Sequence, residues 1–170
     1  MKRDMIKKSI LLTAVLSLGV LLLGGCAGTG SSKAPEVINK VTCTYNFGDI
    51  DGSEMIVVTS DLTVTTYTVY SDSSVNLFAG EIPGENECEM KESAITEEDW
   101  NRITDAINDN GFMKLPEELP KVEAYDGSTC YITVEAESGT HRSGGYCAGN
   151  GSGKEHSRFY EVKKVLYELR

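Results

Sequence analysis

Three consecutive segments with strand-like patterning constrain the fold of this chain more than any other feature. Residues 41–47 alternate apolar and polar side chains with a period of two. Residues 54–59 and 62–70 are rich in β-branched and aromatic side chains, and Ser60-Asp61 between them is typical of a hairpin turn. We predict a shorter fourth strand at residues 75–79. This part of the chain should therefore form an antiparallel meander.

Helical patterning begins only after the meander. Thr96 and Asp99 have the spacing of a capping box, so we predict a helix at residues 96–110, preceded by an edge strand at residues 88–93. A second helix is expected at residues 155–169. Its apolar side chains recur with helical spacing, at Phe159, Val162, Leu166 and Leu169.

A hairpin is predicted between the two helices, and its register determines the expected cysteine pairing. The first strand begins at Cys130, and Ser138-Gly139 is the expected turn. In that register Cys130 faces Cys147 at a separation suited to a disulfide. By elimination, the second predicted bridge joins Cys43 and Cys88. The alternative is four reduced cysteines; zinc is a weaker option, because no pair has the close spacing of structural zinc ligands.

Together these elements predict an α+β fold, in which an antiparallel sheet, built from the meander and the C-terminal hairpin, carries two α-helices on one face. The chain from Trp100 onward contains Gly111-Phe112 with Leu115-Pro116, then Asp126-Gly127-Ser128 ahead of Tyr131-Ile132-Thr133-Val134. In these motifs it is similar to small Gram-positive lipoproteins of unassigned function. The resemblance covers about 70 residues; it implies a similar fold and transfers no catalytic residue.

The amino-terminal region has the composition of an export signal. Four basic side chains precede an apolar run at residues 10–23, which is short for a transmembrane helix. The run ends in Leu23-Gly24-Gly25-Cys26, which resembles the lipobox of bacterial lipoproteins. The resemblance implies cleavage before Cys26, a diacylglycerol thioether on its sulfur, and acylation of the new amino terminus, for example by palmitate. The alternative is an ordinary secretory signal cleaved near Ala27 or Gly28, with Cys26 lost.

This interpretation divides the chain into three parts. Residues 1–25 are a lipoprotein signal peptide that is removed, and residues 26–36 are the lipidated cysteine with a flexible tether. Residues 37–170 form a single domain. We therefore expect a protein that is anchored to the cell membrane through the lipid on Cys26 and faces the extracytoplasmic side.

The mature chain is strongly acidic. Removing residues 1–25, which hold four basic and one acidic side chain, changes the formal net charge from −10 to −13. This charge argues against nucleic acid and anionic lipid headgroups as partners. Residues 81–99 form a candidate surface for a basic protein or peptide, and their acidic side chains are Glu81, Glu85, Glu87, Glu89, Glu92, Glu97, Glu98 and Asp99. The alternative for this segment is an ordinary solvated surface.

The sequence offers little for catalysis. It contains neither a nucleophile elbow nor a zinc-protease motif, and the phosphate-loop-like residues 149–154 depart from the required pattern. His141 and Cys147 are six residues apart on one expected strand, too far for direct proton transfer. We therefore predict no catalytic residue, no metal site and no cofactor.

Two functional hypotheses follow from these observations. The preferred hypothesis is a non-catalytic binding module, in one version an inhibitor or protective protein directed against a basic secreted enzyme. The alternative is a small cell-envelope hydrolase with a carboxylate or metal site. A hydrolase should show a carboxylate with a raised pKa in a cleft, whereas a binding module should show an exposed apolar or tyrosine patch.

Overall fold

The protein is described here by a computed structural model, which covers residues 34–46, 52–70 and 73–169. The predicted signal peptide and the lipidated Cys26 lie outside these residues, as does most of the tether. Within the described part of the chain, no helix is long and apolar enough to cross a membrane.

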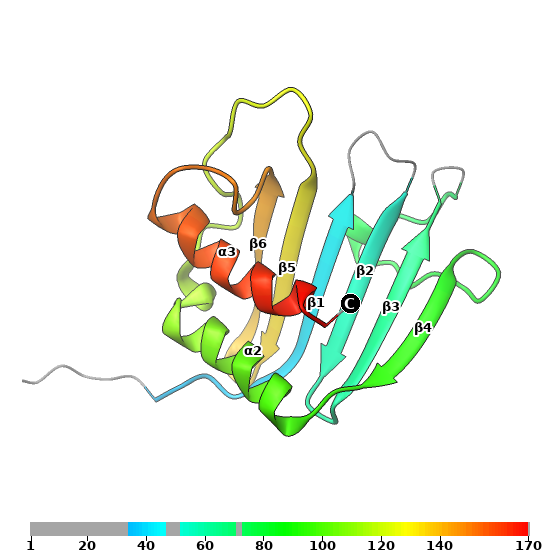
Figure 1. The fold of residues 1–170 in the computed structure, drawn as a ribbon, viewed down its shortest axis with the longest axis horizontal. Helices are drawn as coiled ribbons and strands as arrows, with labels where there is room; N and C mark the ends of the chain where they lie inside the picture. The colour runs from blue at the N-terminus through cyan, green and yellow to red at the C-terminus, as the bar shows by residue number, and fades with distance from the viewer. Residues whose placement is uncertain (1–33, 47–51, 71–72, 170) are drawn as a thin grey trace, which may run out of the picture. The chain divides into compact units, whose positions relative to one another are not determined.

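Six strands form one antiparallel sheet in the order β4-β3-β2-β1-β5-β6. The helices α2 and α3 lie together on one face of this sheet, over β1, β5 and β6 (Figure 1). The strands are β1 (Ile38–Asn46), β2 (Ser53–Thr59), β3 (Thr63–Val69), β4 (Glu89–Ala94), β5 (Thr129–Ala136) and β6 (Gly139–Tyr146). The helices are α2 (Glu97–Asp109) and α3 (Lys154–Tyr167), with short 3-10 turns η1 (Leu77–Ala79) and η2 (Phe112–Lys114). The predicted α+β fold is confirmed.

The start of α2 follows directly from its sequence. The Thr96 hydroxyl accepts a hydrogen bond from the Asp99 backbone N–H at 3.1 Å, and the Asp99 carboxylate accepts one from the Thr96 N–H at 3.2 Å. This reciprocal capping box satisfies two N–H groups that the first helical turn would otherwise leave without partners. The edge strand predicted just before it is also present, as β4.

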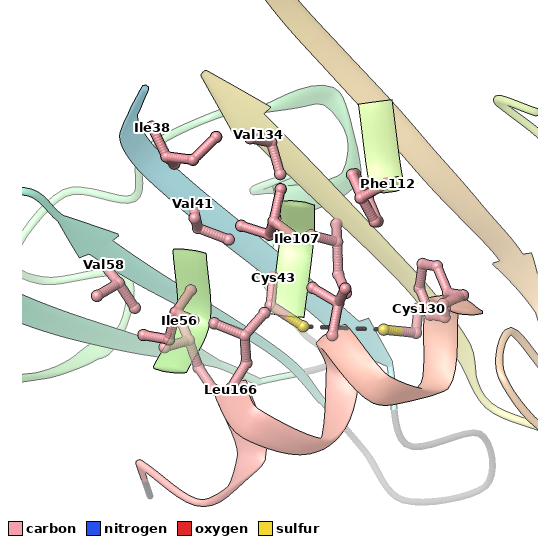
Figure 2. Packing of buried hydrophobic residues seen from close by; sticks show 14 of the residues in the cluster. Ile38, Val41, Cys43, Ile56, Val58, Ile107, Phe112, Cys130, Val134 and Leu166 are labelled. Carbon is pink, nitrogen blue, oxygen red and sulfur yellow. Dashed lines mark hydrogen bonds between the residues drawn. The ribbon is translucent and has the colours of Figure 1, made fainter. Parts of the chain in front are cut away.

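The hydrophobic core lies between the sheet and the two helices. Every second residue of β1 and β5 points into it, and α2 and α3 supply the opposite layer; Figure 2 shows this packing from close by. Core residues that are at most 1% exposed include Val41, Cys43, Ile103, Ile107, Phe112, Ile132, Val134, Phe159, Val162 and Leu166. Among the described residues, no α-helix lies on the other face of the sheet, and this open face is where the candidate site is found.

The fourth strand predicted at residues 75–79 is wrong. In its place the chain forms η1, because the Asn76 side chain accepts hydrogen bonds from the backbone N–H groups of Phe78 and Ala79. Gly80 ends the turn with φ of 81°, a conformation that glycine adopts without steric cost. Leu77 is buried against Met55 and Val69 on the open face of the sheet. The apolar residues of this segment thus cover a sheet rather than extend it.

The register predicted for the C-terminal hairpin is also wrong. Ala136 pairs with Gly139, so the turn is formed by residues 137–138, and Cys130 faces Gly145 instead of Cys147. Cys147 follows the end of β6 with a left-handed φ of 54°.

Neither predicted disulfide is formed. The Sγ atom of Cys43 lies 3.8 Å from that of Cys130, on the neighbouring strand (Figure 2), a thiol–thiol contact well beyond the S–S bond length of about 2.05 Å. Cys88 lies just before β4, outside the main core, where its thiol donates to the Gly84 carbonyl at 3.6 Å. The cysteines are therefore packing residues in this structure.

Candidate functional site

A groove crosses the open face of the sheet, opposite to the face that packs against α2 and α3. Its volume is about 250 Å³. Residues of four strands form the floor and sides, and the chain around η1 forms the opposite wall. The strand residues are Lys40, Thr42, Thr44, Met55, Val57, Thr133, Glu135 and Arg142, and the wall residues are Leu77, Phe78, Ala79, Gly80 and Ile82.

Strand alternation explains the chemistry of this floor. Thr42 and Thr44 alternate along β1 with the core residues Val41 and Cys43, and Thr133 lies opposite Thr42 on β5. The floor therefore combines hydroxyl groups with the aliphatic side chains of β2. Thr44 is only 6% exposed, and its hydroxyl has no hydrogen-bond partner among the described residues. The Thr44 hydroxyl lines the groove, where a polar ligand atom can reach it as donor or acceptor.

One end of the groove is cationic. The Arg142 guanidinium carbon lies 3.9 Å from the centroid of the Tyr131 ring, a cation–π contact. The edge of the Phe78 ring also contacts Tyr131, with the ring centroids 6.0 Å apart. The Tyr131 hydroxyl donates to the Glu118 carboxylate at 2.6 Å. Burial raises the pKa of Tyr131, and the hydrogen bond to Glu118 raises it further, so the phenol stays a protonated donor at neutral pH.

The second cation of the groove is already paired. The Lys40 ammonium group lies 2.8 Å from the Glu135 carboxylate, and both side chains are partly exposed. Such a pair contributes little to stability but cancels both charges locally. Arg142 therefore leaves the lining residues with one net positive charge.

The acidic run at residues 81–99 is divided between carboxylates that complete local turns and carboxylates that are exposed. Three of its carboxylates complete local turns: Glu81 accepts from the Asn76 N–H, Glu87 accepts from the Gly84 N–H, and Asp99 caps α2. The others are exposed on three different elements. Glu85 lies in a loop, Glu89 and Glu92 point to opposite faces of β4, and Glu97 and Glu98 begin α2.

The pKa shifts of the carboxylates favour a structural role for those groups. Hydrogen bonds from Thr59 and Thr63 lower the pKa of Asp61, and hydrogen bonds from Thr96 lower the pKa of Asp99. The raised pKa that a hydrolase would require is therefore not seen at either carboxylate. In the part of the chain that the structure describes, no group of three or more His, Cys, Asp or Glu side chains is arranged to hold a metal ion.

The histidines and the remaining thiols also take structural positions. His156 Nδ1 accepts from the Gly149 N–H at 3.2 Å, and Nε2 lies 2.9 Å from the Pro120 carbonyl, so His156 fastens the loop before α3. The His141 ring packs against Phe112. Burial raises the pKa of the Cys88 thiol, and the nearby Glu87 charge raises it further, which makes this thiol a weak nucleophile.

The groove was missed by sequence reasoning because its residues are spread over four strands and a loop. A partial signal exists, since the outward positions of β1 include threonine where charged residues are usual on a solvated face. No protein-family model matches the chain, and the searches of curated proteins and of solved structures find no significant match. The geometry of the groove is therefore the main indication of function.

Proposed function

We propose that this protein is a membrane-anchored, extracytoplasmic binding module without catalytic activity, and that the groove on the open sheet face is its binding site. The observation that carries the proposal is the composition of the groove: threonine hydroxyls, aliphatic and aromatic surface, and one unpaired guanidinium. This combination of apolar surface with a few positioned polar groups is typical of recognition sites. The preferred ligand is a segment of a peptide or protein outside the membrane.

The anchor follows from the resemblance of Leu23-Gly24-Gly25-Cys26 to a lipobox, and it has a test of its own. A Cys26→Ala chain should no longer incorporate a labelled fatty acid and should no longer accumulate in the membrane fraction as the mature form. If the parent chain and the Cys26→Ala variant are both recovered in the soluble fraction, without fatty acid, the anchor is contradicted.

Site-specific cross-linking in the native membrane tests the binding site. A photoreactive phenylalanine replaces Ile82, a groove residue that is 60% exposed. The matched control carries the same group at Asp105, an exposed residue on α2. We expect a discrete cross-linked product from position 82 and none from position 105. Equal products from both positions, or none from position 82, would refute the groove as the binding site.

A further inference from the structure

Arg142 differs from the other described arginines in having no acceptor. Arg102 pairs with Asp99 and Glu168, and Arg158 donates to the backbone carbonyls of residues 110 and 111. Among the described residues, no hydrogen-bond acceptor or carboxylate is found for Arg142. A guanidinium carries five N–H donors, so this side chain offers a full set of donors to a ligand.

An aromatic contact orients the exposed Arg142 side chain. Its guanidinium lies on the Tyr131 ring, and that ring is held by its hydrogen bond to Glu118 and by the edge contact with Phe78. A guanidinium that stacks on an aromatic ring keeps its edge available for a bidentate pair with a planar anion. Carboxylate is the anion whose geometry matches that edge. The contact with the Tyr131 ring should lower part of the side-chain entropy cost of forming this pair.

The rest of the groove restricts what can carry the carboxylate. Phe78 and Ile82 present apolar surface beside Arg142, and Thr44 contributes its unbonded hydroxyl to the floor. A volume of about 250 Å³ is smaller than the sites that hold drug-sized ligands, so it admits one or two amino-acid residues. The chemistry of the groove thus matches an apolar residue that bears a carboxylate.

Resting on the proposed function, we propose that the groove binds a peptide by its carboxyl terminus. The terminal carboxylate pairs with Arg142, and the last side chain, an apolar one, packs against Phe78 and Ile82. Charge complementarity at the groove favours this ligand, because the ion pair of Lys40 with Glu135 leaves Arg142 as the net positive charge of the lining residues. A basic partner would find the opposite arrangement at the groove.

Three short probes distinguish the sources of a carboxylate. The first is acetyl-Gly-Thr-Leu with a free carboxyl terminus, the second is the same peptide as its amide, and the third is acetyl-Gly-Glu-Leu amide. Isothermal titration with the full chain in detergent should show binding of the first probe and at least tenfold weaker binding of the other two. Equal binding of the amidated first peptide would overturn carboxylate anchoring. Equal binding of the glutamate probe would overturn the assignment of the terminal carboxylate.

Two substitutions connect the binding to the groove. Arg142→Gln should lower the affinity for the free-acid peptide at least tenfold. Its control on α2, Arg102→Gln, should keep that affinity within twofold of the parent chain. Thr44→Val, which keeps the side-chain volume, should lower the affinity for the same peptide about threefold or more. This variant replaces Arg142→Gln in the test if the Arg142 variant does not fold. Unchanged affinity of a folded Arg142→Gln chain would overturn the proposal.

The binding-module proposal and the carboxyl-terminal ligand can be refuted separately. If no probe binds while cross-links from position 82 persist, the carboxyl-terminal ligand is refuted and the binding module stands. If both the probes and the position-82 cross-links are absent, both proposals are refuted.

Discussion

Lys163 allows a sharp test of how the loop before α3 is held. This lysine is only 6% exposed, and its ammonium group donates to the Ala148 carbonyl at 2.8 Å. A second acceptor, the Asn150 side-chain oxygen, lies at 3.5 Å, and the Tyr167 ring centroid lies 5.8 Å away. We predict that Lys163→Met destabilises the domain.

Two effects of opposite sign compete in this substitution. Methionine keeps most of the apolar stem and removes the cost of burying an ammonium group, which favours the variant. The variant loses a charge-assisted hydrogen bond, whose net contribution is about 1.5–3 kcal/mol, and leaves the Ala148 carbonyl without a donor, which costs about 1–3 kcal/mol. These two losses partly overlap, and the relieved desolvation offsets another part. We therefore expect a net loss of about 2 kcal/mol, or about 4–8 °C in Tm for a domain of this size.

Urea unfolding at pH 7, followed by circular dichroism, measures this loss. Lys164→Met is the matched control, because Lys164 is exposed one position further along the same helix. The control should lie within about 0.5 kcal/mol of the parent chain. If Lys163→Met proves as stable as the control, desolvation of the ammonium outweighs its hydrogen bonds, and the reasoning is refuted.

Three further predictions concern the helix cap, the hairpin and the thiols. Thr96→Ala should cost about 1 kcal/mol at pH 7. The hydrogen bonds from Thr96 lower the pKa of Asp99 in the folded state, so their contribution to stability is complete above the unfolded pKa near 3.8 and is lost as the pH falls through the folded pKa. The difference in unfolding free energy between the parent chain and Thr96→Ala, measured with urea, should therefore shrink from pH 5 to pH 2. A difference that does not change with pH would contradict this. Gly144→Ala should cost about 3 kcal/mol or more in thermal unfolding, because a Cβ atom there would lie 2.2 Å from the Cys130 carbonyl oxygen; an unshifted Tm would contradict the close approach. Cys43 and Cys130 should both be alkylated after unfolding without reductant, because diagonal neighbours on adjacent strands lie about 7–8 Å apart, beyond the usual reach of a disulfide. Peptide mass mapping reads the alkyl groups, and a disulfide-linked pair of peptides that carries no alkyl group at either cysteine would contradict the contact seen here.

The hairpin shows what patterning alone can and cannot specify. The predicted and observed registers differ by two residues, and such a shift leaves every side chain on the same face of the sheet. The alternation of Ile132 and Val134 with polar residues is therefore compatible with both registers. The observed register places Gly144 beside Tyr131, where its lack of a side chain permits close backbone contact, and lets its backbone N–H and C=O pair with the chain at residues 117–119. The register of the hairpin therefore depends on contacts with residues 117–119, which the local sequence pattern of the hairpin does not encode.

Local rules did suffice where all the determining contacts lie within a few residues. The cap of α2 joins Thr96 to Asp99, three positions apart, and it was predicted with both partners. The edge strand was predicted at residues 88–93 and is present as β4, although its neighbour β3 ends 20 residues earlier in the chain. The cysteine pairs failed for the opposite reason, because Cys43 and Cys130 meet across β1 and β5, which are separated by most of the domain.

The one strand that was predicted wrongly and the site that was missed have a common cause. Residues 75–79 are mostly apolar, as a short buried strand would be, yet Asn76 and Gly80 cap the 3-10 turn η1. Leu77 is then buried against Met55 and Val69. Had this segment joined the sheet as a strand, it would have extended an edge and left the open face flat. Because the segment crosses that face instead, Phe78 contacts Tyr131, and the segment forms one side of the groove over the threonine residues of the sheet. The groove therefore exists because the capping residues Asn76 and Gly80, and not the apolar side chains between them, determine the conformation of this segment.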